Sequence, residues 1–170
     1  MARVSLGFAR AQLGRTGEGV ALIRQGIAGG VAIGARAGIT DYLTRLADAQ
    51  ALDGAVADAL ATIEDALTVN PEELAFRPHT LTCRGELRLT LGQTELAEAD
   101  FRDAIALART MRAKAFELRA ATSLARLLAH QGHRDAARTL LAEIYGWFTE
   151  GFDTRDLQDA KALLEELGAR

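Results

Sequence analysis

The sequence predicts an all-α fold made of stacked helical hairpins, on three observations. Hydrophobic residues make up 49% of the 170 positions but aromatic residues only 5%, so much of the apolar content is alanine and leucine, which favour helices. The β-branched and aromatic residues that strands prefer are comparatively few. Four glycines, at positions 14, 54, 92 and 132, recur at intervals of 40, 38 and 40 residues. A period of this size is typical of helical-repeat proteins.

Three further columns of residues align with these glycines. A small residue stands seven positions before each one: Gly7, Ala47, Gly85 and Ala125. Another stands five positions after each one: Gly19, Ala59, Ala97 and Ala137. A large apolar residue stands nine positions after: Ile23, Ile63, Phe101 and Leu141. Each unit is therefore predicted to be a helix, a tight turn at a glycine with positive φ, and an antiparallel helix. One hairpin cannot bury its apolar faces alone, so the units must stack.

The periodicity predicts the helices in chain order at 2–13, 17–34, 39–52, 55–69, 74–91, 94–111, 114–131, 134–148 and 154–167. They divide one domain, residues 1–170, into units at about 1–36, 37–71, 72–112 and 113–150, followed by a capping helix at 154–168. The dipeptide Asn70-Pro71 favours a turn and separates the second unit from the third. Asp153 or Thr154 is expected to cap the last helix, whose first turn carries Asp156.

Charge and cysteine content exclude several classes of function. The formal net charge is −3, with basic and acidic residues interleaved, so nucleic acid is not an expected partner. The single cysteine, Cys83, rules out an intramolecular disulfide and suits a reducing cytoplasm. No apolar run approaches the roughly 18 residues of a membrane span, and the N-terminus lacks the apolar core of a signal peptide. A cytoplasmic protein without a membrane association is expected.

The hairpins with glycine and alanine columns resemble the tetratricopeptide repeat (TPR), although the period of 38–40 residues exceeds the usual length of about 34. The whole chain also resembles the C-terminal repeat array of large bacterial proteins that carry a class III nucleotide cyclase domain and an AAA-type ATPase module. The segments that carry this resemblance are residues 13–15, 19–23, 84–89, 97–102 and 118–127, and the tail IYGWFTEGFDT at 144–154.

The resemblance implies a right-handed α-α superhelix, a TPR-like solenoid of about four hairpins. It implies a non-catalytic protein–protein interaction scaffold, the docking or regulatory arm of a bacterial signalling protein. Neither the metal-binding carboxylates of a cyclase nor a Walker motif accompanies it in this chain, so cyclase and ATPase activity are not implied. The implied partner is a protein or peptide, and no cofactor is expected.

Two glycine-rich stretches invite a nucleotide-binding interpretation. The run from Gly14 to Gly19 lacks the Gly-Lys-Ser/Thr ending and the preceding strand of a phosphate loop, so it is interpreted as a helix–helix turn. A second set of glycines falls within the predicted second helix, where each glycine costs about 1 kcal/mol of stability relative to alanine. No strand precedes it, as dinucleotide binding would require. It is interpreted as close packing or helix weakening, at Gly26, Gly29, Gly30 and Gly34.

Metal ligands and nucleophiles are scattered along the sequence. His130 and His133 flank a glycine that should end the helix and part the two rings, so no metal site is expected. Cys83 has no local histidine-plus-acid constellation, and His79 stands alone, so the thiol is interpreted as a small buried side chain. No catalytic residue is predicted. Acidic residues are expected on solvated outer faces, among them Glu64, Asp65, Glu165 and Glu166.

Four of the nine aromatic residues fall within eight positions near the C-terminus: Tyr145, Trp147, Phe148 and Phe152. The first interpretation is a hydrophobic plug between the fourth hairpin and the capping helix. The alternative is an exposed anchor for a partner, since tryptophan and tyrosine are frequent at binding hot spots.

The first helices of successive units would line the concave surface of the solenoid. The residues expected there are Thr44, Asp48, His79, Thr82, Glu86, Arg119, Thr122, Arg126 and His130. They grade from acidic in the second unit to basic in the fourth. We expect an extended peptide or a helix to lie on this surface, with Arg119 and Arg126 holding a carboxylate. The alternative is an ordinary solvated face.

Two further functions stay open from the sequence. A homo-oligomerisation module would pair through its first hairpin, with exposed apolar residues near Val4, Phe8 and Val20. A small-ligand sensor that regulates attached cyclase or ATPase domains would hold a closed apolar pocket between hairpins.

Overall fold

The structure, a computed structural model, describes residues 2–34 and 37–169. Over these ranges the chain forms helices and no strand, which confirms the predicted all-α fold. The helices are α1 (Ala2–Gln12), α2 (Thr16–Ala32), α3 (Ile39–Leu52), α4 (Val56–Thr68), α5 (Arg77–Thr90), α6 (Thr94–Thr110), α7 (Lys114–His130), α8 (Arg134–Tyr145) and α9 (Arg155–Gly168). None of the described helices has the combination of length and apolar character that crossing a membrane requires.

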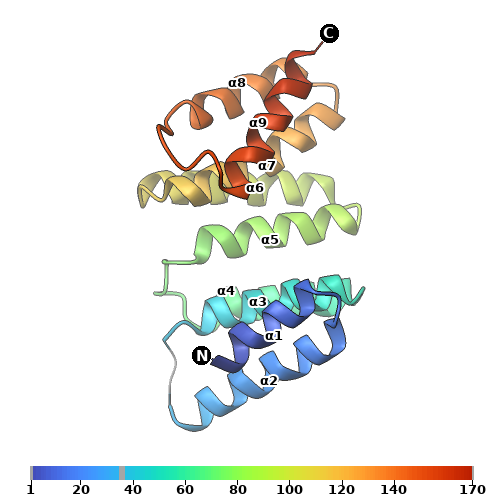
Figure 1. The fold of residues 1–170 in the computed structure, drawn as a ribbon, viewed down its shortest axis with the longest axis vertical. Coiled ribbons are helices and arrows are strands. Elements are labelled where there is room, and N and C mark those ends of the chain that lie inside the picture. Colours follow the sequence, from blue (N-terminus) through green and yellow to red (C-terminus); the bar gives the residue numbers. More distant parts are fainter. Residues whose placement is uncertain (1, 35–36, 170) are drawn as a thin grey trace.

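The helices form antiparallel pairs that follow one another along the long axis of the molecule (Figure 1). The first helices of the hairpins contact one another in order, α1 with α3, α3 with α5, and α5 with α7. Each second helix packs on its own partner and on the first helix of the next pair. Helix α9 packs on α7 and α8 in the place where the first helix of a fifth hairpin would lie. The result is an all-α solenoid.

The repeating glycines close the hairpin turns. Gly14, Gly54, Gly92 and Gly132 have φ values of 84°, 82°, 73° and 87°, in the left-handed region where residues with a Cβ are strained. At the second turn the amide of Ala55 donates to the carbonyl of Gln50 at 2.9 Å, which is the 6→1 hydrogen bond of a Schellman motif. The glycine therefore reverses the chain and lets the next helix begin within three residues.

The small-residue columns mark places where two helix backbones approach closely. A Cβ added at Gly7 would lie 2.7 Å from the carbonyl oxygen of Gly19, and one added at Gly85 would lie 2.5 Å from the ring of Phe101. The large residues nine positions after each turn are fully buried, with no exposed surface at Ile23, Ile63, Phe101 or Leu141. The repeat columns thus correspond to the packing between helices.

Buried apolar residues form two separate clusters. The larger runs from Ala47 in α3 to Leu167 in α9 and joins the second, third and fourth hairpins to the last helix. The smaller joins the first hairpin to α3 through Val4, Ala11, Val20, Ile23, Leu46 and Ala49. The first hairpin therefore shares little of the main core.

Two predicted helix ends differ from the structure by three residues. The helix expected at 74–91 begins at Arg77, because the preceding segment is tied to the start of α3. There the carboxylate of Glu73 accepts a hydrogen bond from the amide of Gly38 at 2.8 Å. Pro78 stands in the first turn of α5, where its missing N–H costs nothing. The helix expected at 134–148 ends at Tyr145 in a turn.

The glycines of the second predicted helix have different roles. Gly26 provides close packing, since an added Cβ would lie 2.8 Å from the Val4 side chain, whereas nothing lies near Gly29. Gly34 lies beyond the helix, which ends at Ala32, and has a φ of 74°. The boundary predicted at residue 36 lies outside the described residues.

Helix α9 begins as predicted after Thr154, with Asp156 in its first turn. The Thr154 hydroxyl, however, donates to the carbonyl of Gly151 at 2.7 Å and does not cap the helix. Glu64, expected on a solvated outer face, has a side chain that is 46% exposed, and its carboxylate accepts from Arg84 and Arg88 at 3.2 and 3.1 Å.

Candidate functional site

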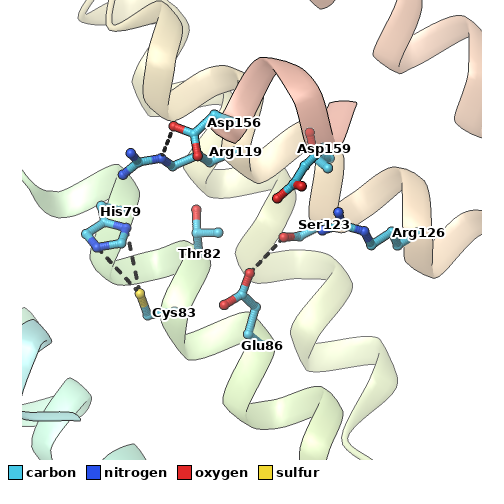
Figure 2. Close-up of a pocket in the computed structure, with 10 residues that line it drawn as sticks. His79, Thr82, Cys83, Glu86, Arg119, Ser123, Arg126, Asp156 and Asp159 are labelled. Atoms are coloured by element: carbon cyan, nitrogen blue, oxygen red, sulfur yellow. Dashed lines mark hydrogen bonds and ion pairs between the residues drawn. The ribbon is translucent and has the colours of Figure 1, made fainter. Parts of the chain in front are cut away.

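Six of the residues predicted for the concave surface line one cavity of about 260 Å³ between α5, α7 and α9. They are His79, Thr82, Glu86, Arg119, Thr122 and Arg126. Cys83, Ser123, Asp156 and Asp159 complete the lining, and Figure 2 shows these side chains converging from the three helices. The two residues from α9 were not among those predicted, because the sequence gives no direct signal of where the last helix crosses the stack.

Two more cavities adjoin the first along the same row of helices. One of about 400 Å³ includes Gln12 of α1 and Asp48 of α3, and shares His79, Cys83 and Glu86 with the first cavity. The other, of about 350 Å³, lies between Phe8, Phe76 and Phe116 and shares His79 and Arg119. We call the surface formed by these three cavities the groove.

Three predicted surface residues are placed differently from the rest. Thr44 is fully buried, and its hydroxyl donates to the carbonyl of Thr40 at 2.8 Å, so it offers nothing to a partner. Asp48 is half-buried and lines the two adjoining cavities. His130 is exposed at the last residue of α7 and lines none of the groove cavities.

The threonines of the groove have their hydroxyls engaged within their own helices. Thr82 donates to the carbonyl of Pro78 at 2.9 Å, and Thr122 donates to that of Leu118 at 2.8 Å. Both residues are buried. They shape the groove floor, while the charged side chains around them remain the groups that could recognise a ligand.

Charges of both signs face one another across the groove. Arg119 donates to the carboxylate of Asp156 at 2.6 Å, and the Ser123 hydroxyl donates to Glu86 at 2.9 Å (Figure 2). Arg126 is exposed at the same cavity and takes part in none of the ion pairs found among the described residues. Of the two arginines predicted to hold a carboxylate, Arg119 therefore already holds one from α9, and Arg126 is available.

The sequence suggested that His79 and Cys83 have no partner for a metal or catalytic site, but the structure places them beside each other. The Sγ atom of Cys83 lies 3.7 Å from Nδ1 and 3.8 Å from Nε2 of His79 (Figure 2). An oxygen of Asp48 completes a set of three potential ligand atoms, all within 4.8 Å of one another. The signal that could have revealed the set is the four-residue spacing of His79 and Cys83 on α5, together with the groove-facing repeat position that Asp48 shares with Glu86 and Arg126.

Burial disfavours the charged form of each of these three side chains. It raises the pKa of Asp48 to about 6 and lowers the pKa of His79 to about 4. Burial, followed by the charge of Asp48, raises the pKa of the Cys83 thiol well above its usual value. An activated cysteine nucleophile needs the opposite, a thiolate stabilised by a positive neighbour. The arrangement does not activate Cys83 for nucleophilic chemistry.

The remaining candidate residues divide between core and surface. Tyr145 and Phe148 are half-buried and pack against the main core, as the plug interpretation expects. Trp147 and Phe152 are 59% and 48% exposed, and the ammonium group of Lys114 lies 5.3 Å from the Trp147 ring centre. Two of the four aromatic residues are therefore half-buried against the core, and two are exposed.

No protein-family model matches the chain, and no curated protein matches it. Among solved structures, the chain is similar to a single-substitution variant of a kinesin light chain-like protein of Podosopora anserina with nearly identical TPR-like repeats. The TM-score is 0.74 at 19% sequence identity, over 98% of this chain and 83% of that one. A structure of that protein without the substitution gives a TM-score of 0.74 at 18% identity over the same shares. At this identity the likeness shows the fold, a TPR-like array of helical hairpins.

Proposed function

We propose that this chain is a non-catalytic interaction scaffold whose groove binds an extended, acidic segment of a protein partner. The observation that carries the proposal is the continuous groove along α3, α5 and α7, with the exposed guanidinium of Arg126 on its wall. Guanidinium groups bind carboxylates through paired hydrogen bonds, which fix the position of a peptide as well as its charge. The mixed polar lining suits a peptide better than the apolar small ligand of a sensor.

The wider setting we propose is the docking or regulatory arm of a bacterial signalling protein that acts in the cytoplasm. It is supported by the resemblance of segments such as 118–127 and 144–154 to the repeat arrays of cyclase and ATPase proteins. The net charge of −3 and the interleaved charges favour a protein partner over a nucleic acid.

A peptide library tests the groove proposal. A displayed library of random peptides is selected on the full chain, and the affinities of enriched peptides are measured by fluorescence polarisation. Acidic peptides are expected to be enriched, and Arg126→Glu is expected to weaken them at least about tenfold, as loss of a charge-assisted contact does. The control is Arg24→Glu, which reverses an exposed arginine on α2 outside the groove. Equal affinity for the wild-type chain and Arg126→Glu would overturn the proposal.

A second candidate function, self-association, is favoured by an apolar stripe on α1. Ala2, Leu6 and Ala9 of α1 and Leu13 just after its end follow helical spacing and are all exposed, Leu6 at 48% and Leu13 at 81%. The positions equivalent to Leu6 in the second and fourth hairpins, Leu46 and Leu124, are buried. Of the three residues near which the sequence predicted exposed apolar surface, Val4 and Val20 are buried, at 1% and 9% exposed, and Phe8 is half-buried.

The occupant proposed for this stripe is the α1 stripe of a second copy, related by a two-fold axis. Light scattering coupled to size exclusion over a concentration series would then show a species of twice 18.2 kDa. Leu6→Glu is expected to return the monomer, and Leu96→Glu, at a 51% exposed leucine on α6, is expected to leave the dimer intact. A monomer at all concentrations would reject self-association.

A further inference from the structure

The side chains of Asp48, His79 and Cys83 bring three different metal-binding groups to one point of the groove. His79 and Cys83 lie one helical turn apart on α5, so both project from the same face. Asp48 reaches them from α3, in the preceding hairpin. Their nitrogen, sulfur and oxygen atoms lie within 4.8 Å of one another. Among the described residues this is the one group of its kind.

The separations suit a small tetrahedral ion. Zinc bonds of about 2.3 Å to sulfur and about 2.0–2.1 Å to nitrogen or oxygen place tetrahedral ligand atoms about 3.3–3.8 Å apart. The Sγ of Cys83 already lies 3.7 Å from Nδ1 of His79. A rotation of the imidazole about its Cβ–Cγ bond would direct one ring nitrogen at the ion. Calcium and magnesium prefer all-oxygen sets, so the thiol and the imidazole favour zinc or a similar transition metal.

An aromatic ring borders the cluster, and one side of the cluster is accessible. The His79 ring is stacked on Phe116 of α7, with 6.0 Å between ring centres and 9° between planes. Cys83 is buried, yet it lines two groove cavities, so an ion can reach it from that side. Glu86, one turn further along α5, lines the same cavities and adds a second carboxylate.

We propose that Asp48, His79 and Cys83 form a zinc-binding site on the floor of the groove. Three protein ligands leave the fourth tetrahedral position to water or to a carboxylate of a bound partner. Binding converts the Cys83 thiol to a thiolate and releases its proton to solvent. The ion would tie α3 to α5, joining the second hairpin to the third. The proposal does not depend on the groove binding a peptide, since metal binding is measured on the chain alone.

Cobalt(II) is the probe of choice, because a thiolate bound to cobalt gives an intense charge-transfer band in the near ultraviolet. Cys83 is the single cysteine, so any such band reports this residue. Titration of the full chain with cobalt is expected to give that band with tetrahedral visible absorption, and zinc is expected to abolish both. Cys83→Ser should remove the band, and Asp48→Asn and His79→Gln should each weaken binding at least about tenfold.

Two controls keep the result decisive. His133→Gln removes an exposed histidine outside the cluster and should leave the titration unchanged. Circular dichroism of each variant shows that the helices are retained, and the Asp48→Asn and His79→Gln variants test the site even where Cys83→Ser fails to fold. Absence of a charge-transfer band in the wild-type chain overturns the proposal. A band that persists unchanged in both Asp48→Asn and His79→Gln also overturns it, because it would report a lone thiol.

Discussion

Arg84 of α5 donates two hydrogen bonds, at 3.0 and 2.7 Å, to one carboxylate oxygen of Asp100 in α6. The other oxygen accepts from Arg88 at 2.8 Å, and the Asp100 side chain is 2% exposed. Both arginines also reach Glu64 of α4, so this network joins two helices of one hairpin to the hairpin before it. An ion network between hairpins therefore supports the apolar stacking.

Removing the buried carboxylate of this network should destabilise the fold strongly. Asp100→Ala removes the buried carboxylate that two largely buried guanidinium groups share and leaves them only the half-exposed Glu64. Breaking a buried ion pair typically costs about 3–5 kcal/mol. Chemical denaturation at neutral pH measures the change in the free energy of unfolding. The comparison is Arg155→Ala, which removes an exposed pair with Asp159 and should change stability by less than about 0.5 kcal/mol. Similar effects of the two substitutions would contradict the role assigned to Asp100.

Because Gly85 approaches its neighbour closely, adding even a methyl group at this position should destabilise the fold. Gly85→Ala places a methyl group 2.5 Å from the Phe101 ring and should destabilise by about 1–3 kcal/mol through overpacking. Gly29→Ala is the matched control, because nothing lies within 4 Å of that position in α2. Alanine there should raise stability by up to about 1 kcal/mol through helix propensity. Thermal unfolding of both variants shows whether the signs are opposite.

Two large aromatic residues should differ sharply in their contribution to stability. Phe101 has no exposed surface, and Phe101→Ala is expected to cost about 3–5 kcal/mol through the cavity it leaves. Trp147 is 59% exposed, and Trp147→Ala is expected to cost less than about 1 kcal/mol. Urea unfolding followed by circular dichroism compares the two. A large loss of stability in Trp147→Ala would indicate that this residue belongs to the hydrophobic plug.

The hydrogen bonds to the Glu117 carboxylate predict that the fold loses stability in acid. Burial acts to raise the pKa of this carboxylate, but hydrogen bonds from Lys114 and Arg109 at 2.8 and 2.7 Å outweigh it and lower the pKa below the usual 4.5. Because the pKa is lower in the folded state, this stabilisation is complete above pH 4.5 and is lost as the pH falls through the folded-state value.

Denaturation midpoints between pH 7 and pH 3 test this dependence. Glu117→Gln should be less stable than the wild type at pH 7, and the difference should shrink as the pH falls below 4.5. Glu165→Gln, at an exposed position on α9, is the control and should follow the wild-type curve. A difference for Glu117→Gln that stays constant over the whole range would rule out the charged form as its cause.

Much of the fold could be predicted because its determinants are local and repeated. Each turn needs a glycine with positive φ, and each close helix pair needs a small residue, so both leave periodic marks such as Gly54 and Gly85. The start of α5 could not be predicted in this way. It depends on the contact of Glu73 with Gly38, which are 35 residues apart and match no repeat column.

The candidate site was only partly predictable for a related reason. The repeat register identifies which side chains face the groove, and it placed Glu86 and Arg126 there. It does not give the angle and spacing between one hairpin and the next. That geometry brings Asp48 of α3 to His79 and Cys83 of α5, and Asp156 of α9 to Arg119. Contacts of this kind follow from how whole helices cross, which a single sequence does not encode in any short pattern.

The division of the apolar core into two clusters determines which part of the array unfolds first under tension. No ion pair among the described residues joins the first hairpin to the second, whereas Arg84 and Arg88 clamp α5 to α4, and Arg109 clamps α6 to Glu117 of α7. Under tension between its ends, such a stack yields first at its weakest junction. The pair α1–α2 would detach while the rest stayed folded, so the chain would lengthen in one step. It would return to its original length when the load is released.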